Sequence, residues 1–175
     1  MTKLGYEHLI TYQNSVEIYD LTVQFCERFL SGRENLRTRE QMIQAARSGK
    51  QCIPEGYLQK SLKGYIKLLG VTRGSFEELL KDYEDFGRTR EIKILPKWDK
   101  WEKGVKRGRS GKYLLPLSPL NPFDPFIPLN YVANLIRRTN YLLDRQIQSL
   151  EEKFIKEGGF TENLFRKRLK FRNHG

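Results

Sequence analysis

Residues 61–86 read SLKGYIKLLGVTRGSFEELLKDYEDF, and this stretch decides the fold class. Its apolar positions recur in alternating steps of three and four residues, a spacing that lines side chains along one face of an α-helix. Each glycine inside the stretch costs ~1 kcal/mol relative to alanine, so packing against other helices has to stabilise it. Ser61 is the predicted N-cap because its hydroxyl can accept a hydrogen bond from the first turn. The seam consists of Leu62, Tyr65, Leu69, Thr72, Phe76, Leu79, Tyr83 and Phe86.

Residues 9–30 and 129–154 show the same helical period. In residues 9–30 the apolar stripe is broad, and we expect the helix to end at Ser31–Gly32, where glycine can adopt the left-handed conformation that closes helices. Gly158–Gly159 ends the other stretch in the same way. A short last helix is predicted in TENLFRKRLKF, with Thr161 as its N-cap.

The helix that comes second in chain order is predicted to begin at Thr38, whose hydroxyl can cap the first turn. Small side chains on its packing face allow a neighbouring helix to approach closely. Pro54 removes one backbone hydrogen bond, so we expect a bend there. The packing face consists of Met42, Ala45, Ala46, Gly49, Cys52 and Ile53.

Residues 96–128 are of a different kind, because they hold six of the seven prolines. Proline at this density is incompatible with a helix interior or a central strand, so we expect an irregular connection. The predicted fold is all-α, an antiparallel four-helix bundle with an irregular Pro-rich insert between helices three and four and a short basic C-terminal helix. The predicted segments are residues 1–95 for the first three helices, 96–128 for the insert, 129–157 for the fourth helix and 158–175 for the basic tail.

The composition of the chain indicates where in the cell the protein is expected. Of the 175 residues, 38% are hydrophobic, which indicates a globular protein, and no apolar run approaches the ~20 residues that span a bilayer. The first residues, MTKLGYEHLITYQNS, contain no secretory apolar region. Two cysteines provide neither a disulfide framework nor a zinc site. We therefore expect a cytoplasmic protein with no membrane association and with reduced thiols.

The net charge of +11 is unevenly distributed. Residues 100–113 hold six basic residues and one acid, and residues 160–175 hold five basic residues and one acid. The rest of the chain is nearly neutral, with a net charge of +2. Clustered cations attract polyanions, so nucleic acid is the expected partner. The candidate nucleic-acid-binding residues are Lys100, Lys103, Lys106, Arg107, Arg109 and Lys112 in the insert and Arg166, Lys167, Arg168, Lys170 and Arg172 in the tail.

Two tryptophans, Trp98 and Trp101, stand among the cations of the insert. Aromatic rings interleaved with cations suit unpaired bases, which stack on the rings while Lys and Arg meet the phosphates. An equally good interpretation is that the tryptophans pin the insert onto the bundle. In the tail, Leu164, Phe165 and Leu169 are candidates for docking the last helix on the bundle.

Motifs for catalysis and cofactor binding do not emerge. Gly111–Lys112 and Gly49–Lys50 lack the Ser or Thr of a phosphate-binding loop, and the two histidines lie near opposite ends of the chain. Cys26 and Cys52 fall on helix stripes, where a thiol is usually a small buried hydrophobe. Gln44, Ser48 and Glu55 are better explained as hydrogen-bonding groups between helices than as ligands. We expect no enzyme activity, no metal and no cofactor.

Residues 41–88 resemble the four-helix-bundle family named after proteins encoded in intervening sequences of bacterial 23S ribosomal RNA genes. That family has a stretch like Q-x-x-R-A-A-x-S-I-x-x-N-I-A-E-G, followed by a helix with a G-S-x-x-E-L pattern. Cys52 and Pro54 depart from it, since the family usually has Asn and often Ala there. The stretch NYLLDRQIQSLEEKFIKEGGFTENLFRKRL resembles the suffix of a longer variant. The matching residues are Gln44, Ala45, Ala46, Ser48, Ile53, Glu55 and Gly56, then Gly74, Ser75, Glu78 and Leu79.

This resemblance implies a cytoplasmic bundle, often a homopentamer, without known enzymatic activity in most members. One branch is the accessory variability determinant of diversity-generating retroelements. Resemblance to this branch implies a basic pentameric ring that binds nucleic acid and a reverse transcriptase. The concentration of charge in the insert and the tail, with which the resemblance agrees, therefore predicts non-catalytic binding of nucleic acid, RNA or an RNA/DNA intermediate rather than plain duplex. The alternative is a protein-interaction scaffold, for example a reverse transcriptase accessory subunit held through the insert.

Self-association is a further expectation. Apolar residues flank the seams of the first and third helices, more than one four-helix core requires, and surplus apolar surface marks interfaces. We therefore expect a cyclic homo-oligomer, with five subunits implied by the resemblance alone. The flanking residues are Leu9, Ile18, Leu21 and Phe25 in one helix and Ile66, Leu68, Val71 and Leu80 in the other.

Overall fold

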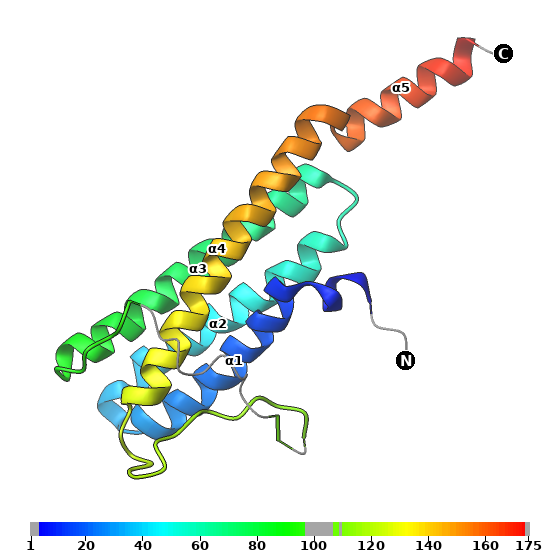
Figure 1. Cartoon of the computed structure of the whole chain (residues 1–175). Coiled ribbons are helices and arrows are strands. Elements are labelled where there is room, and N and C mark those ends of the chain that lie inside the picture. Colours follow the sequence, from blue (N-terminus) through cyan, green and yellow to red (C-terminus); the bar gives the residue numbers. More distant parts are fainter. Residues whose placement is uncertain (1–3, 97–106, 109, 174–175) are drawn as a thin grey trace.

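The computed structural model describes residues 4–96, 107–108 and 110–173. Four helices form an antiparallel bundle in which each packs against two neighbours, so that α4 closes the ring against α1 (Figure 1). No strand occurs within those described ranges. The predicted fold class is confirmed. The helices are α1 (Ile10–Phe29), α2 (Leu36–Tyr57), α3 (Leu62–Thr89) and α4 (Phe126–Glu157), followed by α5 (Phe160–Asn173).

Short 3-10 helices precede the first two helices, η1 (Gly5–His8) and η2 (Arg33–Asn35). Because η2 leads directly into α2, Thr38 lies inside the helix, and its prediction as the N-cap is wrong. Gly32 has a φ of −69°, so the expected left-handed conformation is also wrong. The 3-10 turn reverses the chain instead, with the Asn35 amide donating to the Gly32 carbonyl at 3.0 Å.

The seam of α3 packs as its spacing predicts. Ser61 Oγ accepts a hydrogen bond from the Gly64 amide at 3.4 Å, which confirms the cap. The side chains of Leu69, Phe76 and Tyr83 are fully buried. Packing on the neighbouring helices therefore compensates for the glycines in this helix.

Helices α2 and α3 approach closely along the small-residue face of α2. A Cβ atom at Gly49 would lie 2.4 Å from the ring of Phe76, so only glycine leaves room for that ring. Thr72 Oγ1 donates to the Gly49 carbonyl at 3.1 Å and ties the two backbones together. Pro54 lies inside α2, which continues to Tyr57.

The apolar residues flanking the two seams are mostly used within one chain. Ile18, Leu21 and Phe25 have no exposed surface, and Leu80 is buried as well. Only Val71 is exposed, at 42%. Leu9, Ile66 and Leu68 are half-buried, so four of the eight residues belong to the core of one chain and the other four keep exposed surface. Self-association stays a prediction.

Helix α4 begins at Phe126 rather than at Leu129. Pro125 precedes the helix and Pro128 lies in its first turn, where the missing amide costs nothing because first-turn amides have no partner within the helix. The Leu129 amide already donates to the Pro125 carbonyl at 2.9 Å. The last prolines of the insert thus start α4 instead of ending the irregular segment.

Candidate nucleic-acid interface

Helix α5 is set apart from the bundle by the glycine pair at its start. Gly158 has a φ of +78°, a conformation that favours glycine, and its amide donates to the Phe154 carbonyl at 2.9 Å. Glu162 Oε2 accepts from the Gly159 amide at 3.0 Å. The helix therefore begins at Phe160, and the prediction of Thr161 as the cap is wrong, since Glu162 satisfies the first turn. The chain changes direction here, and α5 extends away from the bundle (Figure 1).

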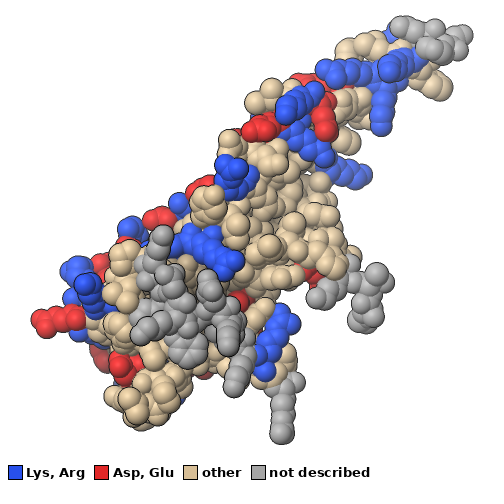
Figure 2. Space-filling view, viewed as in Figure 1, with Lys and Arg blue, Asp and Glu red and all other residues tan. Residues whose placement is uncertain are grey.

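The cations of α5 are all exposed. The helix holds five basic residues and one acid, Glu162, a net charge of +4 over its length. Figure 2 shows blue side chains gathered over α5, whereas blue and red side chains alternate over α3. Arg166, Lys167, Arg168 and Arg172 form no ion pair with any other described residue. The predicted basic tail is thus a helix on which these four cations have no carboxylate partner among the described residues.

The apolar side chains of α5 are exposed too. Leu164 exposes 55% of its surface, Phe165 61% and Phe171 84%. Leu169 is also exposed, so the expected docking of this helix on the bundle is wrong. Phe165 and Phe171 point to different sides of the helix because residues six apart differ by about 240° around its axis. Leu164 and Phe171, seven residues apart, share one face of the helix, and Phe165 and Leu169, four apart, share another.

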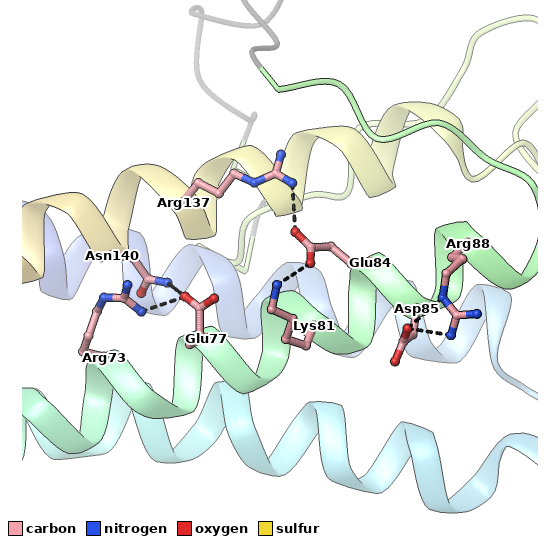
Figure 3. A network of polar contacts seen from close by, with 8 residues as sticks. All are labelled: Arg73, Glu77, Lys81, Glu84, Asp85, Arg88, Arg137 and Asn140. Carbon is pink, nitrogen blue, oxygen red and sulfur yellow. Dashed lines mark hydrogen bonds and ion pairs between the residues drawn. The ribbon is translucent and has the colours of Figure 1, made fainter.

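Some cations of the bundle, unlike those four cations of α5, form ion pairs with carboxylates. Arg73 Nη1 lies 2.8 Å from Glu77 Oε2 on α3. Glu84 accepts from Lys81 at 2.8 Å and from Arg137 of α4 at 3.0 Å, which links the two helices (Figure 3). The hydrogen bond from Lys81, opposed by burial and aided by Arg137, lowers the pKa of the Glu84 carboxyl. These charges are balanced locally and support the α3–α4 interface.

The described part of the insert forms a tight hairpin. Arg107 and Tyr113 pair in an isolated antiparallel bridge, and the Gly108 amide donates to the Lys112 carbonyl at 2.8 Å. Gly111, with a φ of +78°, closes the turn through a 2.9 Å hydrogen bond to the Gly108 carbonyl. The described residues of the insert otherwise form no helix or strand before α4, as expected for an irregular connection.

Polar side chains spaced four residues apart on α1 hold the insert. Asp20 Oδ2 accepts from the Tyr113 amide at 3.2 Å. Gln24 donates to the Tyr113 carbonyl at 2.7 Å and accepts from the Leu115 amide at 3.0 Å. Arg28 Nε donates to the Pro122 carbonyl at 2.8 Å. Sequence reasoning missed this ladder, although the spacing of Asp20, Gln24 and Arg28 is visible along one helix face.

Arg107 is partly engaged by the protein itself. Its guanidinium lies 4.4 Å from the centre of the Tyr113 ring and donates to the Tyr113 hydroxyl at 2.6 Å. Its charge also acts on Glu17, whose carboxyl accepts from the Tyr131 hydroxyl at 2.5 Å. Burial raises the pKa of Glu17, while this hydrogen bond and the charges of Arg107 and Arg138 lower it. Lys112, on the same hairpin, is exposed.

The described hairpin of the insert and α5 lie apart within one chain. The hairpin is docked on α1 through Asp20 and Gln24, and α5 follows the opposite end of α4 (Figure 1). Six of the predicted residues lie outside the described residues, namely Lys100, Lys103, Lys106, Arg109, Trp98 and Trp101. The tail residues Arg166, Lys167, Arg168, Lys170 and Arg172 all lie on α5.

Two clefts open on the described surface. One, of about 470 Å³, lies between α2 and α3 and is lined by Gln44, Ser48 and Ser75 among others. Ser75 Oγ donates to Ser48 Oγ at 3.1 Å, which agrees with the interhelical interpretation of Ser48. Glu55 is exposed and does not line this cleft. The second cleft, of about 430 Å³, lies at the start of α5.

The described residues can also be compared with what metal sites, reactive thiols and membrane spans require. Within residues 4–96, 107–108 and 110–173, no group of His, Cys, Asp and Glu side chains is arranged to hold a metal ion. Cys26 and Cys52 are buried, as predicted for Cys52, and burial raises the pKa of the Cys26 thiol to about 12. None of the helices in the described ranges combines the length and apolarity needed to cross a membrane.

Comparison of the chain with protein-family models, with curated proteins and with solved structures found no match. The family resemblance described above therefore stays a prediction.

Proposed function

We propose that this protein binds nucleic acid without catalysing a reaction and that α5 makes the main contacts. The observation that carries the proposal is the charge of α5, which holds five exposed cations and one acid, whereas α3 holds five cations and five acids. Most side chains of α5 are exposed, so this helix contributes little to the stability of the fold. Its uncompensated charge attracts a polyanion.

The cations of α5 are placed on two sides of the helix. Arg168 and Arg172, four residues apart, share one face, and Lys167 and Lys170, three apart, share another. Because cations lie on two sides of this helix, a strand that runs along either side meets cations that can contact its phosphates. Backbone contacts of this type bind without strict sequence selection.

The insert is the second contact in this proposal. Lys112 is exposed at the hairpin, and Arg107 is held beside Tyr113. Because the hairpin and α5 lie apart, they contact different parts of a nucleic acid or different molecules. In a cyclic homo-oligomer both segments are repeated around the ring, so weak contacts per subunit add as avidity.

The family resemblance supports the same proposal. It favours a cytoplasmic, oligomeric accessory protein, with five subunits as one arrangement, and RNA or an RNA/DNA intermediate as the ligand. It also favours a reverse transcriptase as a protein partner.

Truncation tests the proposal. We expect a chain that ends at Gly159 to bind single-stranded RNA on the order of tenfold more weakly than the full chain at low salt, because the phosphate contacts of α5 are lost. Helix α5 does not pack on the bundle, so the circular dichroism spectrum should lose only the signal of α5. Reversing Lys106, Arg107 and Arg109 to Glu tests the insert in the same assay. Unchanged affinity in both variants would defeat the proposal.

The scaffold alternative has one observation in its favour. The insert exposes 95% of Leu120 and 76% of Phe123, although Arg28 and Gln24 hold its backbone on α1. Apolar side chains presented by a docked segment suit a protein partner. If the protein binds polyglutamate as tightly as structured RNA and truncation changes neither, the scaffold role is favoured.

A further inference from the structure

The cleft at the start of α5 is built from three parts of the chain. The end of α2 and the connection to α3 contribute Tyr57, Gln59 and Lys60, the end of α4 contributes Lys153, and α5 contributes Phe160. These segments meet at the end of the bundle from which α5 extends (Figure 1). Its volume of about 430 Å³ falls in the range of roughly 300–1,000 Å³ typical of sites for small ligands. The other lining residues are Ser61, Leu62, Tyr65, Leu150, Glu157, Gly158 and Asn163.

Aromatic rings form the walls of this cleft. Tyr57 is held edge-on by two other tyrosines, with ring centres 5.9 Å from Tyr65 and 6.1 Å from Tyr6. It nevertheless exposes 42% of its surface, and Phe160 is exposed as well. A ring that is oriented by its neighbours and still open to solvent is a ready stacking surface for a base.

The polar groups of the cleft suit a nucleotide. Lys60 and Lys153 bring two positive charges, of which Lys153 lies 3.9 Å from the carboxylate of Glu157. The side-chain amides of Gln59 and Asn163 line the cleft too, and amides both donate to and accept from base edges. The cleft therefore combines rings for a base, amides for its edge and a net positive charge for its phosphate.

The cleft between α2 and α3 has none of this combination. Its charged lining residues are Arg37, Glu40 and Glu78, a net negative set, and no aromatic residue lines it. A phosphate is repelled there and a base finds no ring. The two clefts are similar in volume, so chemistry and not size distinguishes them.

We propose that the cleft at the start of α5 binds an unpaired nucleotide, with its base against Tyr57 and Phe160 and its phosphate near Lys60 and Lys153. This inference rests on the proposed function, because a strand bound along α5 begins next to the cleft. The base must be unpaired, since both faces of a base inside a duplex are covered by its neighbours. The ligand is thus single-stranded nucleic acid, or a duplex with a single-stranded end.

The test compares single-stranded and duplex ligands. We expect the double variant Tyr57→Leu with Phe160→Leu to bind single-stranded RNA about tenfold more weakly than the full chain, because stacking on the rings is lost while apolar bulk remains. Its affinity for duplex RNA should stay the same. The matched control is Tyr141→Leu, which removes an exposed ring of α4 outside the cleft and should leave both affinities unchanged.

A further measurement uses the unaltered chain, so its result does not depend on whether the double variant folds. An RNA carrying one 4-thiouridine, bound to the unaltered chain and irradiated, should cross-link to Tyr57 or Phe160. Cross-links confined to other residues, or equal losses for single-stranded and duplex RNA, would overturn the inference. If neither the chain ending at Gly159 nor the insert variant binds more weakly than the full chain, the proposed function fails. If truncation weakens binding but the double variant does not, only the nucleotide cleft fails.

Discussion

Helices α3 and α5 hold the same number of cations but use them differently. Each has five basic residues, yet α3 also has five acidic residues while α5 has only one. In α3, Arg73 and Lys81 pair with carboxylates, and the opposite face of the helix is buried in the core. In α5, neither charged nor apolar side chains are covered by the bundle. Charge in α3 is balanced along the helix, whereas α5 carries a net charge of +4 that attracts a polyanion.

The largest expected difference between the two helices concerns phenylalanine. Phe76→Ala should lower the free energy of unfolding by about 3–5 kcal/mol, because this ring is fully buried against Gly49. Phe171→Ala makes the same chemical change on α5, where the ring is 84% exposed, and should alter stability by less than about 0.5 kcal/mol. Urea unfolding of both variants measures the difference. Similar losses would show that α5 packs on something in solution.

The next effect is pH-dependent and belongs to the core alone. Burial raises the pKa of Cys26 from 9.0 to about 12 and raises that of Tyr83 well above 10.0. The folded state therefore favours the neutral thiol, and its stabilising contribution is complete below pH 9 and lost as the pH rises toward 12. We expect Cys26 to reduce the free energy of unfolding by about 1.4 kcal/mol per pH unit in this window.

Cys26→Ala provides the control for this effect. The variant should be less stable at neutral pH because of the cavity, but its stability should fall less steeply above pH 9 than that of the original chain. Chemical unfolding followed at several pH values gives both slopes. Parallel curves for the two proteins would contradict the assigned burial of this thiol.

The smallest effect concerns the outer face of α3. A Cβ atom at Gly70 or Gly74 meets no atom within 4 Å, so replacing either residue with alanine should raise the free energy of unfolding by about 0.5–1 kcal/mol. Gly49→Ala is the control and should destabilise, since its Cβ would meet the Phe76 ring at 2.4 Å. Thermal unfolding and light scattering measure stability and mass. Destabilisation by Gly70→Ala would indicate that a second subunit covers this face.

Much of the bundle was predictable from the sequence because its signals are local. The seam from Leu62 to Phe86 follows from residue spacing, and Ser61 caps it as expected. The caps at Thr38 and Thr161 were wrong because neighbouring groups satisfy those first turns, through η2 in one case and Glu162 in the other. Several side chains near a helix start can compete for the same amides, and spacing does not choose among them.

The candidate interface was predictable in composition but not in geometry. The excess of cations in residues 160–175 identified α5, yet the pattern did not say that Leu164 and Phe165 stay exposed. That outcome depends on whether another helix offers a complementary face, which is a long-range property. The docking of the insert by Asp20, Gln24 and Arg28 is long-range for the same reason, since its partners lie far along the chain.

The most direct test of the account is the salt dependence of RNA binding in two matched variants. Arg168→Gln with Arg172→Gln removes two positive charges from α5, and Lys81→Gln with Arg88→Gln removes two from α3. Each phosphate contact on a single strand contributes ~0.7 to the slope of log affinity against log salt. If α5 makes the contacts, the magnitude of this slope should fall by about 1.4 for the α5 variant and stay unchanged for the α3 variant. Equal changes in the two variants would contradict it, because net charge and not α5 would then govern binding.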